Sequence, residues 1–105
     1  MPMDKVAALT EILQQNPNDA FARYGLAMEF ASQGDLTAAL DQFLQLLERH
    51  PDYTAGYFMA AQTLQRAGRL DEAKERLRQG IASAARTGNQ HAQAEMQAAF
   101  DELMA

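Results

Sequence analysis

The chain has 105 residues, a formal net charge of −5 and no cysteine. The length suits one domain, which we place over residues 1–105, and the acidic balance argues against non-specific binding to nucleic acid or anionic lipid. The lack of cysteine excludes disulfides, a thiolate nucleophile and a cysteine-based zinc site. No apolar run approaches the roughly 18 residues of a membrane span, and acids interrupt the N-terminal apolar residues, unlike in a signal peptide. We therefore expect a cytoplasmic protein.

The spacing of apolar residues, three and four positions apart, predicts six helices. Asp4, Asp35 and Asp52 precede three of them and are expected to cap their first turns. Gly34 and Gly68 follow two of them, where glycine can adopt the left-handed conformation that ends a helix. The expected helices cover about residues 5–15, 20–33, 36–49, 53–67, 70–87 and 90–104.

A repeat organises the middle of the chain. Pro17 and Pro51 each close a predicted helix and stand 51 − 17 = 34 residues apart. The same offset pairs Ala27 with Ala61, Gly34 with Gly68, Leu36 with Leu70, Ala39 with Ala73, and Gln45 with Gln79. A fixed period of this size is typical of a helical repeat array.

Three features predict how the helices pack and pair. The helix over residues 36–49 has an apolar arc too wide for one contact, so we expect it to contact the first helix on one side and the second unit on the other. Gly80 lies inside a predicted helix, where it costs about 1 kcal/mol relative to alanine, and this suggests close packing of another helix. Glu72 and Arg76 are expected to form an ion pair on a solvated helix face.

Both units carry small and large apolar residues at matching positions. The first has Leu26-Ala27, Phe30, Gly34-Asp35, Ala39, Phe43 and Pro51, and the second has Tyr57, Ala60-Ala61, Leu64, Gly68, Ala73 and Leu77. With this pattern the chain resembles the tetratricopeptide repeat (TPR) family, although Arg23 stands where that family prefers an aromatic residue.

The resemblance implies an all-α fold in which antiparallel helix hairpins form a right-handed superhelical array, an α-solenoid of about six helices. It divides the chain into an N-terminal helix, a first repeat, a second repeat and a C-terminal capping helix. These four parts are expected over residues 1–16, 17–50, 51–84 and 85–105.

No residue pattern typical of an enzyme is present. His50 and His91 have no HExxH spacing and no cluster of oxygen ligands beside them, so we expect no metal, and we expect His50 to contact the end of its own helix. Ser32 and Ser83 do not lie in a nucleophile elbow, and no glycine-rich phosphate loop occurs. We therefore expect a protein that is not an enzyme, needs no cofactor and takes no small-molecule substrate.

In the TPR family the first helix of each unit lines a concave surface, where partner proteins or peptides commonly lie. The resemblance places these candidate groove residues there: Phe21, Tyr24, Met28, Phe58, Met59, Gln62 and Arg66. Methionine and aromatic side chains are typical of adaptable contact surfaces, but the alternative is that several of these residues belong to the core.

Some family members grip a peptide carboxylate with Lys, Asn and Arg. The matching positions here bring no positive charge: Tyr24, Met28, Met59, Asn89 and Gln93.

The sequence therefore predicts an interaction or scaffold module that holds an apolar or amphipathic protein segment in a concave groove, with Arg66 orienting that segment. The alternative is a homo-oligomerisation module that assembles through the same surface or through its terminal helices. Two complete units are fewer than the roughly three that such arrays need, so flanking helices or a second copy must supply further burial.

Overall fold

The computed structural model describes residues 4–105, and those residues form six helices and no strand. This confirms the expected all-α array of six helices, with most helix ends at the predicted residues. The prediction for α4 began one residue early and ended one residue late. The helices are α1 (Lys5–Gln15), α2 (Ala20–Ser32), α3 (Leu36–Arg49), α4 (Thr54–Arg66), α5 (Leu70–Thr87) and α6 (Gln90–Met104).

Short polar side chains and glycines set the helix ends, largely as the sequence predicts. A side-chain oxygen of Asp4 accepts a hydrogen bond from the Val6 backbone N–H at 3.0 Å, and Asp35 caps α3 in the same way. Gly34 has a φ of +82° and Gly68 one of +75°, so both adopt the left-handed conformation that lets the chain leave a helix.

The expected cap at Asp52 is wrong. The residue before α4 is Tyr53, and it makes no side-chain capping hydrogen bond. In the first hairpin, which consists of α2 and α3, the position equivalent to Tyr53 is Asp19. Asp19 caps α2, so Asp52 stands one residue too early to reach the first turn of α4. Asp52 instead accepts hydrogen bonds from Arg86 Nη2 (2.9 Å) and Nε (3.0 Å) at the end of α5.

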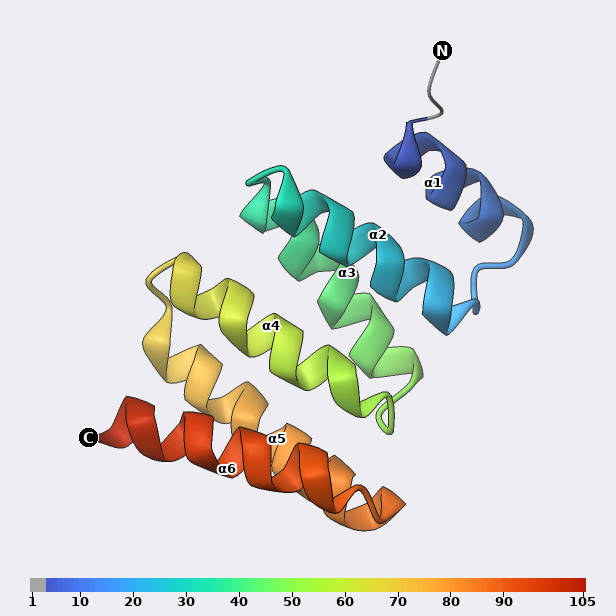
Figure 1. The fold of residues 1–105 in the computed structure, drawn as a ribbon. Coiled ribbons are helices and arrows are strands. Elements are labelled where there is room, and N and C mark those ends of the chain that lie inside the picture. Colours follow the sequence, from blue (N-terminus) through green and yellow to red (C-terminus); the bar gives the residue numbers. More distant parts are fainter. Residues whose placement is uncertain (1–3) are drawn as a thin grey trace.

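The helices stack in chain order, with α1 and α6 at opposite ends of an array of 46 × 29 × 21 Å (Figure 1). Helix α4 contacts α2, α3, α5 and α6, whereas no Cα atom of α3 lies within 8 Å of one in α5. The first helices of successive hairpins are thus closer together than the second helices. The stack therefore curves, with α2, α4 and α6 on the concave side and α3 and α5 on the convex side.

Helix α3 packs on two sides as predicted, but the prediction that one of these sides contacts the first helix is wrong. Its contacts are with α2 and α4, and the second of these confirms the expected contact with the following unit. Helix α1 contacts α2 and has no Cα atom within 8 Å of α3. The apolar arc of α3 is therefore covered by its own hairpin partner and by α4, without help from the first helix.

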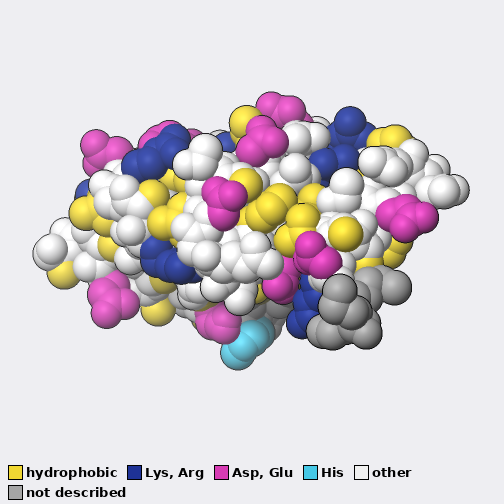
Figure 2. Space-filling view, turned by 90° about the horizontal axis from the view of Figure 1, so that it is seen from above, with side chains coloured by type: hydrophobic (Ala, Val, Ile, Leu, Met, Phe, Trp, Pro, Cys, Tyr) yellow, Lys and Arg dark blue, Asp and Glu magenta, His cyan; other side chains and the backbone are white. Residues whose placement is uncertain are grey.

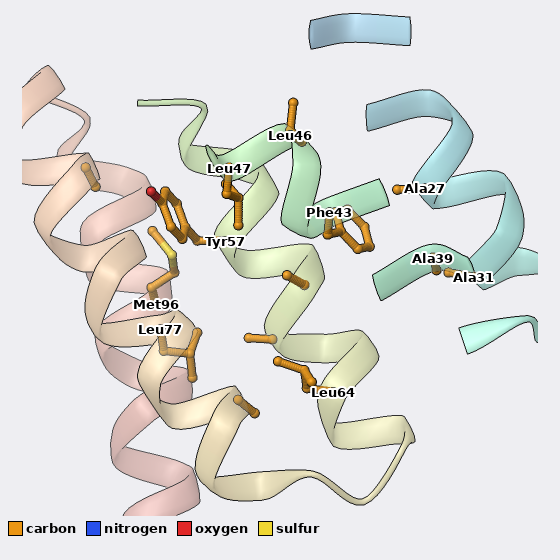
Figure 3. Packing of buried hydrophobic residues seen from close by; sticks show 14 residues of the cluster. Ala27, Ala31, Ala39, Phe43, Leu46, Leu47, Tyr57, Leu64, Leu77 and Met96 are labelled. Carbon is orange, nitrogen blue, oxygen red and sulfur yellow. The ribbon is translucent and has the colours of Figure 1, made fainter. Parts of the chain in front are cut away.

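Two clusters of buried residues hold the stack together. The main cluster runs from α2 to α6 and includes Phe43, Leu46, Leu77 and Met96, none more than 1% exposed (Figure 3). A smaller cluster joins α1 to α2 and consists of the buried residues Leu13, Ala22 and Leu26. Most of the buried apolar residues thus lie in the two hairpins (α2–α3 and α4–α5) and in α6. Helix α1 is attached to α2 through the smaller cluster.

Close packing at Gly80 is confirmed. A Cβ atom built at this position would lie 2.7 Å from Cβ of Tyr57 on α4 and would overlap the sulfur of Met96 on α6. Side-chain Cβ atoms in real structures do not approach other atoms this closely. Glycine therefore lets α4, α5 and α6 meet at one point, near the Tyr57 and Met96 side chains in Figure 3.

Arg23 is buried in the first hairpin, at the position where the TPR pattern has an aromatic residue. Its Nη1 donates to the side-chain oxygens of Gln42 (2.8 Å) and Gln45 (3.0 Å) on α3, and its Nη2 donates to the carbonyl oxygen of Pro17 (3.0 Å). Burial, followed by the positive charge of Arg49, lowers the pKa of Arg23 from its usual value. The guanidinium joins α2, α3 and the preceding turn through neutral acceptors.

The surface view in Figure 2 shows hydrophobic side chains interspersed with acidic and basic ones, so charge of one sign does not dominate that face. Over residues 4–105, none of the helices combines the length and apolar character needed to cross a membrane.

Candidate functional site

The concave side of the array contains a hollow of about 430 Å³ between α2, α4 and α6. Four of the seven predicted groove residues line it: Tyr24, Phe58, Met59 and Gln62. The other lining residues are Thr54, Ala55, Asn89, Ala92, Glu95 and Met96. The structure therefore brings most of the predicted aromatic and methionine side chains together at one place, and adds a wall from α6.

The floor of this hollow is shared with the core. Tyr24, Met28, Phe58 and Met59 are half-buried and pack against the main buried cluster. Each of these side chains thus has one side in the core and another side exposed. The alternatives of groove and core are therefore not exclusive for these residues, and Met28 lies outside the lining of the hollow itself.

Tyr24 is held in place by other aromatic rings. Its ring meets Phe43 edge to face at a centroid distance of 6.3 Å and lies 5.3 Å from the ring of Tyr53. Burial raises the pKa of both tyrosines, with a smaller contribution from Tyr53 for Tyr24 and from Asp19 for Tyr53. Both phenols therefore stay protonated at neutral pH and can donate a hydrogen bond.

Phe21 and Arg66 are the two predicted residues that are exposed and lie outside the lining of the hollow. Phe21 is 78% exposed near the start of α2 and does not line the hollow. Arg66 is exposed at the end of α4, where its Nη1 donates to the carbonyl oxygen of Ala31 at 3.1 Å. Arg66 thus also links the ends of α2 and α4, a contact that sequence reasoning did not predict.

The α6 wall was not among the predicted site residues. A side-chain oxygen of Asn89 accepts from the Ala92 backbone N–H at 3.0 Å, and this cap fixes the start of α6 beside the hollow. Glu95 lies 3.4 Å from Nε2 of His91 and is the charged residue of the lining. In the sequence, Ala92 and Met96 stand four positions apart on this wall, but the resemblance to the repeat family assigns residues 85–105 to a capping helix.

Neither histidine belongs to a metal site within residues 4–105, where no three His, Asp or Glu side chains are arranged to hold an ion. His50 makes the expected contact with the end of its own helix through its backbone, whereas its side chain contacts a different part of the chain. Its ring Nε2 lies 3.1 Å from the carbonyl oxygen of Asn18, so the side chain reaches the α1–α2 turn, and its own helix is capped through its backbone N–H.

Comparison with known proteins agrees with this architecture. The tetratricopeptide repeat family model matches residues 2–58. A TPR repeat-containing protein of Pseudomonas aeruginosa is 31% identical over 91 residues, which cover 87% of each chain.

Solved structures show the same relationship. The crystal structure of a tetratricopeptide repeat domain protein from Salinibacter ruber has 34% identity and a TM-score of 0.76, covering 82% of this chain and 96% of that one. A solution structure from Bordetella parapertussis has a TM-score of 0.83 over 98% of this chain and 90% of its own, and with 24% identity it shows the shared fold alone. This chain belongs to the tetratricopeptide repeat family.

Proposed function

We propose that this protein is a non-enzymatic interaction module that holds an apolar or amphipathic segment of a partner protein in the hollow between α2, α4 and α6. TPR folds generally mediate protein–protein interaction, and proteins of the family are typically not enzymes. The observation that carries the proposal is the lining of the hollow, in which the exposed sides of Tyr24, Phe58 and Met59 lie together.

The chemistry of the lining supports an apolar occupant. A hollow of about 430 Å³ can take a few large side chains of a bound segment. Methionine adapts to side chains of different shape, and aromatic rings contribute contact area at a small entropic cost. Glu95 and Gln62 at the edge favour an occupant whose apolar face points inward and whose polar face carries amide or basic groups.

A charge placed in the hollow tests this proposal. Met28 and Met59 are half-buried, so replacing them would also remove core packing. Ala55 and Gln62 are exposed, and Ala55→Glu with Gln62→Glu adds two carboxylates to the lining without removing core contacts. We expect peptides selected on the wild-type protein from a random display library to be apolar or amphipathic, and to bind this variant at least about tenfold more weakly.

The matched control is Gln14→Glu with Ala82→Glu, which adds the same charge at exposed positions outside the hollow. It should keep the wild-type affinity, and both variants should melt at nearly the wild-type temperature. Selected peptides that bind the hollow variant as tightly as the control would contradict the proposed groove.

A second candidate function is self-association through α1. Ile12 is 44% exposed on the outer side of this helix, beside Ala8 and Gln15, and in the described part of the chain α1 contacts no helix other than α2. A second copy could cover this apolar surface. Sedimentation equilibrium at micromolar concentration should then show a dimer that Ile12→Lys dissociates, whereas a wild-type monomer under those conditions would exclude self-association as the function.

A further inference from the structure

The convex side of the array contains a pocket that the proposed groove function does not use. Since α3 and α5 do not approach each other, the space between them is open down to α4 and has a volume of about 300 Å³. Its floor is apolar, with the buried residues Phe43, Ala60 and Leu64, and its α3 wall includes Leu40 and Leu44. The pocket thus offers a site for one large apolar side chain.

The leucines of this wall are not a general requirement of the repeat. Leu44 remains 42% exposed although it lies at the pocket. The offset of 34 residues matches Leu40 with Lys74 (40 + 34) and Leu44 with Arg78 (44 + 34) in the second hairpin. Both equivalent positions are charged, and Arg78 lies 5.0 Å from the centroid of the Phe100 ring. Helix α3 thus exposes an apolar surface where α5 carries cations.

One cation at the rim of the pocket lacks a carboxylate partner within residues 4–105. Glu72, which the sequence paired with Arg76, instead forms a two-pronged ion pair with Arg69, with one N···O distance of 2.8 Å. This pair lowers the pKa of Glu72, with contributions from its hydrogen bond to Arg69 and from the charges of Arg69 and Arg76. Arg76 donates to the neutral side chain of Gln79 at 2.9 Å and forms no ion pair in the described part of the chain.

The opposite rim carries a negative charge. On α3, Asp41 accepts a hydrogen bond from the side chain of Gln45 at 3.0 Å and faces the pocket. A bound carboxylate is therefore repelled on the α3 side and attracted on the α5 side, where Arg76 lies. The charges at the rim thus define an orientation for an occupant with one acidic group.

We propose that this convex pocket is a second docking site, which takes a protein segment with a large apolar side chain next to an acidic residue. The apolar side chain contacts Leu44 and the floor at Leu64, and the neighbouring carboxylate pairs with Arg76. Because this site lies on the face opposite the hollow between α2, α4 and α6, a segment in one does not block the other.

A peptide titration tests the proposal. The probe is the acetylated and amidated pentapeptide Glu-Glu-Leu-Glu-Glu, compared with Gln-Gln-Leu-Gln-Gln and with Glu-Glu-Ala-Glu-Glu at physiological salt. We expect the first peptide to shift the methyl resonances of Leu40, Leu44 and Leu64 in a saturable manner. The neutral peptide and the alanine peptide should each bind at least about fivefold more weakly, because one lacks the carboxylates and the other the apolar side chain.

Two matched variants locate the site. Arg76→Gln should weaken binding of the acidic leucine peptide by about fivefold, and Arg78→Gln, which removes the same charge from the other side of α5, should leave it unchanged. The variant Ala55→Glu with Gln62→Glu should also bind normally, so failure of the concave groove would not affect this result. Equal losses in the two arginine variants, or equal binding of the neutral peptide, would overturn the proposal.

Discussion

At the scale of single residues, Arg23 and Tyr57 perform the same task with different chemistry. They occupy equivalent positions in the two hairpins, and each donates to the carbonyl oxygen of the proline six residues earlier. Arg23 reaches Pro17 at 3.0 Å, and Tyr57 reaches Pro51 at 2.7 Å. The position therefore requires a long side chain with a terminal donor more than it requires an aromatic ring, since the donor joins the helix to the turn that precedes it.

This equivalence predicts that different substitutions of Arg23 lower the free energy of unfolding by different amounts. Arg23→Ala should lower the free energy of unfolding by about 2 to 3 kcal/mol, because it removes three partly buried hydrogen bonds, including those to Gln42 and Gln45. Arg23→Tyr should lose only about half as much, since a tyrosine there can reach Pro17 as Tyr57 reaches Pro51. Urea unfolding followed by circular dichroism measures both values. A tyrosine variant as unstable as the alanine variant would show that the contacts to α3 provide the stabilisation.

Helix ends could be predicted from the sequence where a single residue determines the local conformation. Gly34 and Gly68 could be predicted because a left-handed turn has few other solutions, and Asp35 because it directly precedes a helix. The burial of Arg23 could not, because a charged residue at an aromatic position gives no sign of the glutamines and the carbonyl oxygen that surround it. Asp52 was misassigned because capping depends on the helix start to within one residue.

At the scale of elements, the glycines inside helices predict how closely neighbouring helices approach. A Cβ atom at Gly80 would collide with α4 and α6, whereas one at Gly25 would meet the Leu9 side chain at an ordinary 3.5 Å. Gly80→Ala should therefore destabilise the protein by about 1 to 3 kcal/mol through overpacking. Gly25→Ala should stabilise it by about 0.5 to 1 kcal/mol, because alanine favours the helix.

Thermal unfolding of the two glycine variants provides the measurement, and Gly25→Ala serves as the matched control for helix propensity. If Gly80→Ala raised the melting temperature as Gly25→Ala does, the three helices would not meet at Gly80 as closely as the structure shows.

The position of α6 explains why part of the candidate site could not be predicted. Helices α2 and α4 begin 54 − 20 = 34 residues apart, but α4 and α6 begin 90 − 54 = 36 residues apart, because α5 extends to Thr87. The repeat offset therefore fails for α6 by two residues. Tyr24, Phe58 and Met59 could be assigned to the concave side from the repeat, while Glu95 and Met96 could not. In space α6 nevertheless packs on α4 and α5, much as α4 packs on α2 and α3.

At the scale of the whole molecule, the helices differ in how many neighbouring helices they pack against. Helix α4 contacts four other helices and contributes Tyr57 and Leu64 to the main buried cluster. Among the helices of residues 4–105, α1 contacts only α2, through the small cluster around Leu13. In repeat arrays stability is approximately a sum of the stability of each unit and of its interfaces with its neighbours. A terminal helix with a single interface can therefore open without unfolding the rest.

Native-state hydrogen exchange should resolve this difference. We expect amides of α1 to exchange through an opening that costs at least about 2 kcal/mol less than the opening that exposes amides of α4. Met96→Ala provides the internal control, because this side chain is fully buried on α6, far along the array from α1. The variant should lower the free energy of exchange in α4 by about 2 to 4 kcal/mol through the cavity it creates.

The same variant should leave the opening of α1 unchanged, since the altered core is present both before and after α1 detaches. The loss of Met96 packing is the same whether α1 is attached or detached. It therefore cancels in the free energy of opening that hydrogen exchange in α1 measures. Equal decreases in α1 and α4 would mean that the six helices unfold as one cooperative unit, and that the interface between α1 and α2 is as strong as those among the hairpins and α6.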